Sequence, residues 1–482
     1  MAQGVAATTL RAFRHRNFQL FISGQIISLT GTWMDSVAQA WLVYRLTGSS
    51  VLLGLIAFAN QIPVFLISPI GGHVADRWNR HRIVIATQAA SMVLALTLAG
   101  LTMTGRIRIC ELFLLAALLG IVNAFDVPAR QSFLVQMVGR EDLMNAIALK
   151  SSMFNGARMV GPAIAGLLVA KIGEGWCFFA NGISYIAVIS GLLMMKVGPV
   201  ERQPLALSAV GNIVDGFRYV ARTASIRSLL IMLAVLSLAG LPFTVLMPIF
   251  ADLILHGGPR AFGLLMGCIG LGAMCGALLL ASRTRTAGLQ RWVWTASAAF
   301  AAAIAGFAYS RSLPLSCGLL LAAGFAMMIQ VGSTNTLIQS MVPDHYRGRV
   351  MSVYSMVLIG ISPLGAMAAG FEAAHVGASL TLLAGALLCL GSAVWFAASD
   401  SLHLSAVFFP TWGQSFRFAA ELPLGAERDR FLYLVPIGMG PPDPGAMAAG
   451  FDPRILERRS SVEVRRQPLR KSPPNSATIR VL

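Results

Sequence analysis

Charged side chains are scarce in this chain. Asp, Glu, Lys and Arg together make up 12% of its 482 residues, whereas soluble proteins carry about 25%. Hydrophobic residues account for 56% of the chain, and its mean hydropathy is +0.71. This composition excludes a soluble globular protein and makes the lipid bilayer the solvent for most of the chain.

The sequence also lacks paired cysteines and histidine clusters. Its six cysteines lie singly inside apolar segments without C-x-x-C spacing, so we interpret them as small core residues rather than disulfides or metal ligands. The seven histidines fall in connections, helix ends or tails. We therefore expect no metal or cofactor site, and a membrane-embedded enzyme is the disfavoured alternative from another functional class.

A phosphate-binding loop is missing as well. One apolar segment is rich in glycine, but no strand precedes it and no Gly-Lys-Ser/Thr sequence follows it. An ATP-driven pump is therefore disfavoured. Acidic residues are few, 20 against 37 basic ones, and the net charge is +17. Because the basic residues are dispersed through connections, the expected partner is anionic lipid and not nucleic acid.

Long apolar stretches recur throughout the first 400 residues. About 20 apolar residues form a helix that spans the bilayer. The first stretch is too long for the core of a signal peptide, so we expect it to remain as a membrane helix. The breaks between stretches predict helices near residues 17–44, 50–72, 83–103, 110–136, 143–170, 175–195, 227–253, 260–282, 291–310, 315–341, 350–372 and 376–398.

Basic residues concentrate in alternate connections, which predicts the topology. By the positive-inside rule, the N-terminus, the 196–226 connection and the C-terminal tail face the cytoplasm, in the inner membrane. The predicted organisation is an all-α membrane protein with twelve transmembrane helices in two pseudo-symmetric six-helix bundles. Its parts are an N-terminal bundle over 1–195, a cytoplasmic connecting loop over 196–226, a C-terminal bundle over 227–398 and a mostly disordered cytoplasmic tail over 399–482.

The two halves resemble each other in sequence. At a constant offset of 204 residues, Gly156 and Gly161 align without a gap with Gly360 and Gly365. A duplicated six-helix unit explains this match better than chance does. Duplicated halves suit a transporter in which one half rocks against the other around a central site.

A short polar run, residues 72–82, separates the second and third predicted helices. It contains Gly72, Asp76, Arg77 and Arg80. These residues match the Gly-x-x-x-Asp-Arg/Lys-x-Gly-Arg/Lys-Arg/Lys loop of the major facilitator superfamily, and the chain resembles the branch with enterobactin exporters and related multidrug efflux proteins. Asn79 replaces the second glycine, and Asn tolerates the left-handed backbone that glycine would supply. The resemblance implies a loop that acts as a conformational latch at the cytoplasmic side; a merely solvated charged loop is the alternative.

The fifth predicted helix contains a second family motif. Gly161, Pro162 and Gly166 resemble the Gly-Pro-x-x-Gly-Gly core of the antiporter signature, with Ala165 in place of the first paired glycine. The resemblance implies a bend in an exporter that exchanges substrate for protons. An ordinary kinked and closely packed helix explains the same residues.

Charges within the predicted helices are the main candidates for proton or substrate binding, since a charge at the bilayer centre costs at least ~2.5–3.5 kcal/mol. Asp35, Asp126 with neighbouring Asn123, and Arg158 are such candidates. Asp126 can also form a local pair with Arg130, four residues later on the same face. Likewise, Arg158 can be a counter-ion to one of the acids, and Asp35 can reach the outer interface.

The second half offers neutral groups at the corresponding positions. At the 204-residue offset, Asp126 corresponds to Gln330 and Arg130 to Thr334. We therefore expect coupling to reside in the N-terminal half, whereas hydrogen bonds to substrate come from Gln330, Ser333, Thr334 and Asn335.

These observations predict a monomeric secondary transporter that exports a small siderophore-like or amphipathic molecule by proton antiport with alternating access. The proton gradient replaces any cofactor. The alternative within the same class is an importer or facilitator of a small metabolite.

Overall fold

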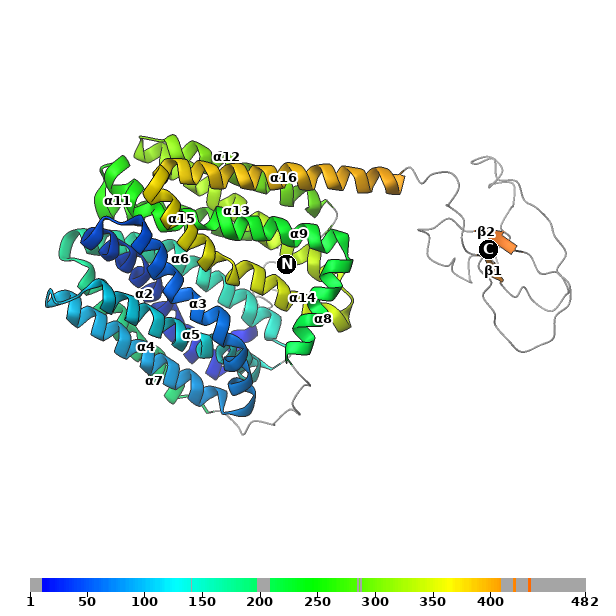
Figure 1. Cartoon of the computed structure of the whole chain (residues 1–482). Coiled ribbons are helices and arrows are strands. Elements are labelled where there is room, and N and C mark those ends of the chain that lie inside the picture. Colours follow the sequence, from blue (N-terminus) through cyan, green and yellow to red (C-terminus); the bar gives the residue numbers. More distant parts are fainter. Residues whose placement is uncertain are drawn as a thin grey trace, which may run out of the picture. The chain divides into compact units, whose positions relative to one another are not determined.

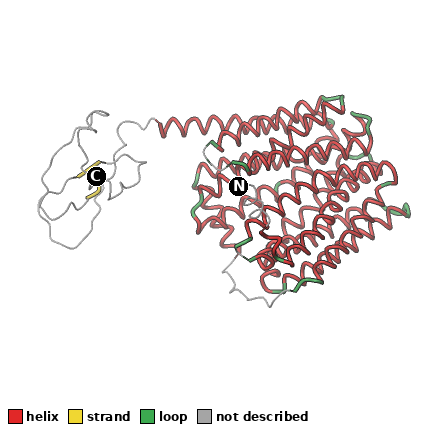
Figure 2. The backbone as a smooth tube through the Cα atoms, turned by 180° about the vertical axis from the view of Figure 1, so that it is seen from behind, coloured by secondary structure: helices red, strands yellow, loops and turns green. Residues whose placement is uncertain are grey.

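The structure is a computed structural model that describes residues 11–139, 141–196, 209–283, 286, 288–408, 419–421 and 432–434. The chain divides into two compact units, Met1–Ala398 and Ser399–Leu482. The first unit is a bundle of long helices (Figures 1 and 2). Most of the predicted tail lies outside the described residues; those described there are the end of the last helix and an antiparallel pair of strands, β1 (Ala419–Glu421) and β2 (Leu432–Leu434).

The N-terminal half consists of a short helix η1 and six long helices. Each long helix coincides with one of the first six apolar segments of the sequence. Their bounds are η1 (Arg11–Arg14), α2 (Arg16–Thr47), α3 (Ser50–Arg77), α4 (Arg80–Met103), α5 (Ile109–Val138), α6 (Leu143–Ile172) and α7 (Glu174–Leu193). α2 ends at Gly48, which adopts the left-handed conformation (φ 61°) that favours glycine.

The C-terminal half begins with an irregular rod. It runs through α9 (Ala224–Val235), the π-helix η2 (Leu236–Gly240), the 3-10 helix η3 (Leu241–Leu246), α10 (Met247–Ile249) and the π-helix η4 (Phe250–Ile254). Pro242 and Pro248 lack the amide hydrogen of a regular helix, which accounts for part of this irregularity. The helices that follow are α11 (Gly258–Ala281), α12 (Leu289–Tyr309), α13 (Leu313–Met341), α14 (Asp344–Ser355), η5 (Met356–Gly360), α15 (Ser362–Val376) and α16 (Ala378–Phe408).

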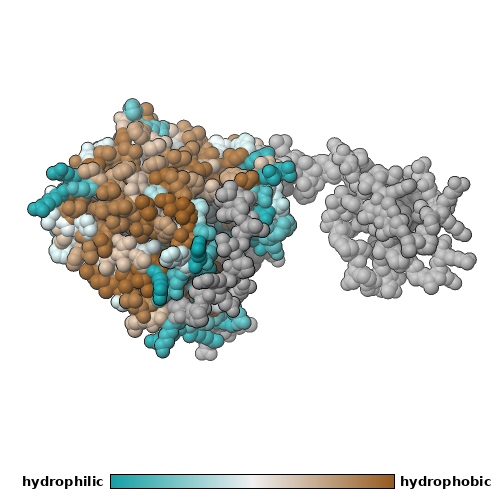
Figure 3. Space-filling view, turned by 60° about the horizontal axis from the view of Figure 1, so that its bottom comes forward, coloured by the Kyte–Doolittle hydropathy of each residue, from teal (hydrophilic) through white to brown (hydrophobic). Residues whose placement is uncertain are grey.

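Eleven segments of the described chain are long and apolar enough to cross a membrane by length and composition. α2 is not among them, although it has 32 residues and packs along α6 and α7. Its polar side chains, such as Gln25 and Asp35, lower its hydropathy. Many large apolar side chains lie on the outside of the bundle, and Figure 3 shows them covering most of the visible helical surface. The predicted all-α membrane fold is confirmed.

The connection between the halves contains a helix that the sequence did not predict. α8 (Ala209–Arg222) lies within the expected 196–226 loop and packs on α14. Tyr219 of α8 stacks on Tyr346 with ring centroids 4.8 Å apart. Arg349 of α14 pairs with Asp215 of α8. The glycine and charges in this short segment hid a helix that is amphipathic rather than apolar.

The cysteine prediction was only partly right. The six cysteines are free, and Cys177 and Cys389 are buried. Cys110 and Cys275 are exposed. An apolar segment of a membrane protein has one side facing lipid, so a cysteine within it is not necessarily in the core.

The halves pack similarly. α3 lies along α5 in the first half, and α11 lies along α13 in the second. The two halves meet where α6 packs on α11 and α3 packs on α15. This arrangement defines two ends of the bundle, which we name by residues: the basic end, with Arg77, Arg80 and Arg82, and the Gly173 end, with Gly48 and Gly258.

Candidate transport site

An ion pair lies inside the N-terminal half. The Asp126 carboxylate on α5 pairs with Arg130, one turn later on the same helix. It also accepts hydrogen bonds from Thr87 (2.7 Å) and Gln88 (3.0 Å) of α4. Arg130 donates to Gln25 of α2 at 3.0 Å. The predicted local pair is therefore present, and it joins three helices.

Asp35 faces the interior of the same half, not the outer interface. It is 7% exposed, and Asn181 of α7 is its polar neighbour. The carboxyl group lines a cavity of ≈ 20 Å³ between α2, α4, α5 and α7. A cavity of this size holds about one water molecule. Its other polar lining residues are Gln39, Ser91, Asn181 and Tyr185.

Tyr185 interacts with both charged centres of this half. It is buried in α7 and interacts electrostatically with Asp35 and with Arg130. Its phenol contacts the hydroxyl groups of Thr32 and Ser91. Sequence spacing could not reveal this residue, because Tyr185 comes from another helix than Asp35 and Arg130.

Two further cations lie on α6. Arg158 sits over the indole ring of Trp33 on α2, 5.7 Å from its centroid. Neither Asp35 nor Asp126 pairs with it, so the counter-ion interpretation of Arg158 is wrong for the described residues. Lys150, which the sequence analysis overlooked, lies close enough to Arg130 for the two cations to repel each other. Its position in α6, seven residues after Leu143, could have identified it as a charge within a membrane helix.

The neutral candidates of the second half lie on α13. Gln330, Ser333 and Thr334 are buried. Neither amide atom of Gln330 nor the hydroxyl group of Ser333 has a hydrogen-bond partner among the described residues. Asn335 accepts a hydrogen bond from Gln339. A buried donor or acceptor without a partner costs about 1–3 kcal/mol, so Gln330 and Ser333 can form further hydrogen bonds with a bound molecule. The remaining neutral candidate, Asn123, lies in the first half and is half-buried on α5.

The predicted loop over 72–82 is wrong in its conformation. α3 continues through Gly72 and Asp76 to Arg77, and α4 begins at Arg80. Asn79 is not left-handed: its φ and ψ are −67° and 109°, and its side chain caps α4 by accepting from two backbone amides. An N-cap is a common role for Asn, and it explains the substitution better than glycine mimicry does.

Asp76 pairs within its own half in this conformation. Its partner is Arg80, at 3.4 Å, and its side chain is 72% exposed. The acid that the family motif assigns to the latch is therefore available to a partner from the other half.

Glycines of the antiporter-like motif lie where helices touch. α6 is continuous through Pro162. A Cβ atom on Gly161 would lie 2.6 Å from Trp33 Cβ, and one on Gly166 would lie 2.8 Å from Gly263 Cα of α11. Gly166 therefore allows α6 of the first half to contact α11 of the second at backbone distance.

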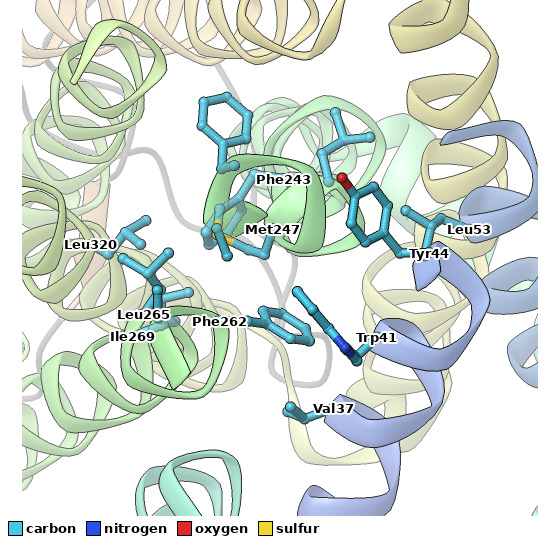
Figure 4. Packing of buried hydrophobic residues seen from close by; sticks show 14 of the residues in the cluster. Val37, Trp41, Tyr44, Leu53, Phe243, Met247, Phe262, Leu265, Ile269 and Leu320 are labelled. Carbon is cyan, nitrogen blue, oxygen red and sulfur yellow. The ribbon is translucent and has the colours of Figure 1, made fainter. Parts of the chain in front are cut away.

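The two halves also bind each other near the Gly173 end. The Tyr44 hydroxyl group of α2 donates to Asp252 of η4 at 3.0 Å. Trp41 stacks on Phe262 of α11 with centroids 6.2 Å apart, and Figure 4 shows the two side chains next to each other, with Met247 near Phe262. Ser50 donates to the Gly370 carbonyl group at 2.8 Å. These contacts close the junction of the halves at this end.

A match of residues 7–405 to the transmembrane secretion effector model decides the family. The chain belongs to the transmembrane secretion effector family. It is similar to the staphyloferrin A transporter of Staphylococcus aureus, with 27% identity over 72% of this chain and 87% of that protein. It also resembles the multidrug efflux pump Tap of Mycolicibacterium fortuitum, with 28% identity over 76% of this chain and 91% of that pump.

Solved structures of other transporters share the fold of this chain. A bacterial homologue of the lysosomal transporter Spinster, in an inward-facing and unoccupied conformation, superposes with a TM-score of 0.63 at 16% identity, over 81% of this chain and 98% of that one. The nucleoside transporter NupG gives a TM-score of 0.64 at 13% identity, again over 81% and 98%. The predicted major facilitator resemblance is confirmed, and the chain is a multi-pass membrane transporter rather than an enzyme.

Proposed function

We propose that this transporter exports a small amphipathic or siderophore-like molecule across the inner membrane in exchange for protons, with its basic end in the cytoplasm. The observation that carries the proposal is the Asp126–Arg130 pair, buried among Thr87, Gln88 and Gln25. A titratable acid inside a membrane bundle is costly and marks an ion or substrate pathway.

The asymmetry of the halves supports coupling in the first half. The corresponding residues of α13 are Gln330 and Thr334, which carry no charge. Protonation of Asp126 would release Arg130 from its ion pair and change the cost of exposing or closing the central site. The similarity to a multidrug efflux pump supports outward transport, and the similarity to the staphyloferrin A transporter supports a small siderophore-like substrate.

Alternating access fits the contacts between the halves. They gather near the Gly173 end, where Tyr44, Ser50 and Gly166 each contact the second half. At the basic end, Asp76 pairs only within the first half among the described residues. This is the arrangement expected when the cytoplasmic side is open. In the opposite state, the contacts between the halves at the Gly173 end break. Asp76 then binds a partner from the second half across the junction.

Everted membrane vesicles that contain the full chain test this function. A panel of amphipathic dyes is added with an imposed pH gradient, with and without an uncoupler. We expect dye accumulation that the uncoupler abolishes, and its loss in Asp126→Asn at normal expression. Unchanged accumulation in both Asp126→Asn and Asp35→Asn would overturn the residue assignment. Accumulation that is insensitive to the uncoupler would overturn proton antiport and favour a facilitator.

A further inference from the structure

One half of α6 carries an unusual concentration of polar residues for a membrane helix. These residues lie between its start at Leu143 and its middle and are Lys150, Ser151, Ser152, Asn155 and Arg158. From Val160 to Ala170 the helix contains only apolar residues, glycine and proline. Lys150 and Arg158 are eight residues apart, which is about 12 Å along the helix axis.

Both cations lack an acidic partner among the described residues. Asp126 is occupied by Arg130, and the Asp35 carboxyl group faces Asn181 and the small cavity. The proximity of Lys150 to Arg130 adds repulsion. Two unpaired positive charges within a membrane helix are expected to face water or a ligand of opposite charge, because lipid cannot solvate them.

Arg158 lies at the junction of the two halves. A Cβ atom on Gly270 of α11 would lie 2.6 Å from the Arg158 carbonyl oxygen, so the second half touches α6 at this residue. The guanidinium group itself lies over Trp33 of α2. The two halves therefore meet at this residue, with α11 against its main chain and α2 against its guanidinium group, as helices of both halves meet at the central site of a rocking transporter.

A second aromatic ring lies beside Trp33. Trp33 packs edge-on against Phe154 of α6, with centroids 5.6 Å apart. Phe154 is 44% exposed. A guanidinium group over one ring can bind a carboxylate while an apolar group rests on the neighbouring exposed ring.

We propose that this polar half of α6 is the substrate-binding face, and that it selects amphipathic organic anions: Arg158 and Lys150 bind carboxylate groups, and Trp33 with Phe154 accepts the apolar or aromatic part. The proposal rests on the export function above. It assigns the substrate class and adds Lys150, Trp33 and Phe154 to the site. The corresponding positions of the second half, Tyr354 and Ser362, bear no charge, so the anion binds to one half.

Carboxyfluorescein and rhodamine 6G provide a matched pair of probes, since they share a xanthene ring but differ in charge. The full chain is reconstituted in proteoliposomes of zwitterionic lipid, and uptake is measured under an imposed pH gradient against empty vesicles. We expect saturable carboxyfluorescein transport. In Arg158→Gln and Lys150→Gln its KM should rise about 10- to 100-fold, the loss expected for a charge-assisted contact.

Two control variants separate binding from folding. Lys171→Gln removes the same charge from the exposed other end of α6 and should leave KM unchanged. Arg158→Lys should retain more transport than Arg158→Gln. A second series with added phosphatidylglycerol tests whether lipid phosphates are the true partners, since they would then compete with the dye and raise its KM in the wild type.

The outcomes distinguish this proposal from the export function. Rhodamine 6G transport that is equal in the wild type and Arg158→Gln, without carboxyfluorescein transport, would overturn anion selection and leave export standing. Failure to transport either dye would count against both. A KM that rises with phosphatidylglycerol would assign the cations to lipid and overturn their role in substrate binding.

Discussion

Arg130 bridges two helices of the N-terminal half: it pairs with Asp126 on α5 and donates to Gln25 of α2. Removal of one member of a buried ion pair leaves the other uncompensated, at a cost of about 3–5 kcal/mol. We therefore expect Asp126→Asn and Arg130→Gln each to lower the thermal midpoint of the detergent-solubilised protein. The double variant should be more stable than either single variant. Additive losses would show that the two residues do not act as a pair.

Gly166 provides the sharpest steric test of contact between the halves. Its replacement by Ala places a Cβ atom 2.7 Å from the Pro259 carbonyl oxygen, so the Gly173 end should close less well and transport should fall. Gly391 of α16 is the control, because no atom lies within 4 Å of the corresponding Cβ position. Gly391→Ala should keep transport and stabilise α16 by about 0.5–1 kcal/mol. Equal transport in the two variants would contradict this contact.

Tyr44→Phe should shift the conformational equilibrium towards the state open at the Gly173 end. It removes the hydrogen bond to Asp252, worth about 1 kcal/mol, or roughly a fivefold change in population. Cysteine labelling near Trp41 with a membrane-impermeant maleimide would detect the shift. Tyr354→Phe is the control, since its hydroxyl group donates to Val331 within the second half. Labelling that is unchanged in Tyr44→Phe would exclude a gating role.

Asp76→Asn should reduce transport while leaving folding intact. Asp76 is 72% exposed in its pair with Arg80, and ion pairs that water reaches contribute about 0–1 kcal/mol to stability. Asp76 is proposed to contribute to transport in the opposite state, in which its carboxylate binds a partner from the second half across the junction. Transport rates and thermal midpoints of the same preparations separate these effects. A stable variant with wild-type transport would reduce Asp76 to a solvated charge.

The helices and the local pair could be predicted from the sequence because both depend on short-range patterns. The length of each apolar stretch predicted a membrane-spanning helix. The spacing of four residues between Asp126 and Arg130 placed both side chains on one face of α5. Thr87 and Gln88 could not be predicted as partners of Asp126, since their proximity depends on how α4 packs against α5. The same holds for Tyr44 and Asp252, 208 residues apart.

The errors have equally local causes. The charges of residues 72–82 suggested a loop, but charged residues are compatible with helix ends, and Asn79 provides the cap for α4. Lys150 belongs to neither family motif and to a different helix from Asp35 and Asp126, so sequence spacing does not relate it to either acid. Its lack of an acidic partner among the described residues follows from the tertiary contacts of Asp126 and Asp35.

Proton movement that accompanies substrate movement tests the central claim most directly. The full chain in proteoliposomes is suspended in weakly buffered medium, and a pH electrode records the response when a transported dye is added. We predict a dye-dependent proton flux in the wild type, and none in the folded Asp126→Asn, Arg130→Gln double variant. A flux in that double variant at the wild-type ratio of protons to dye would contradict coupling through this pair.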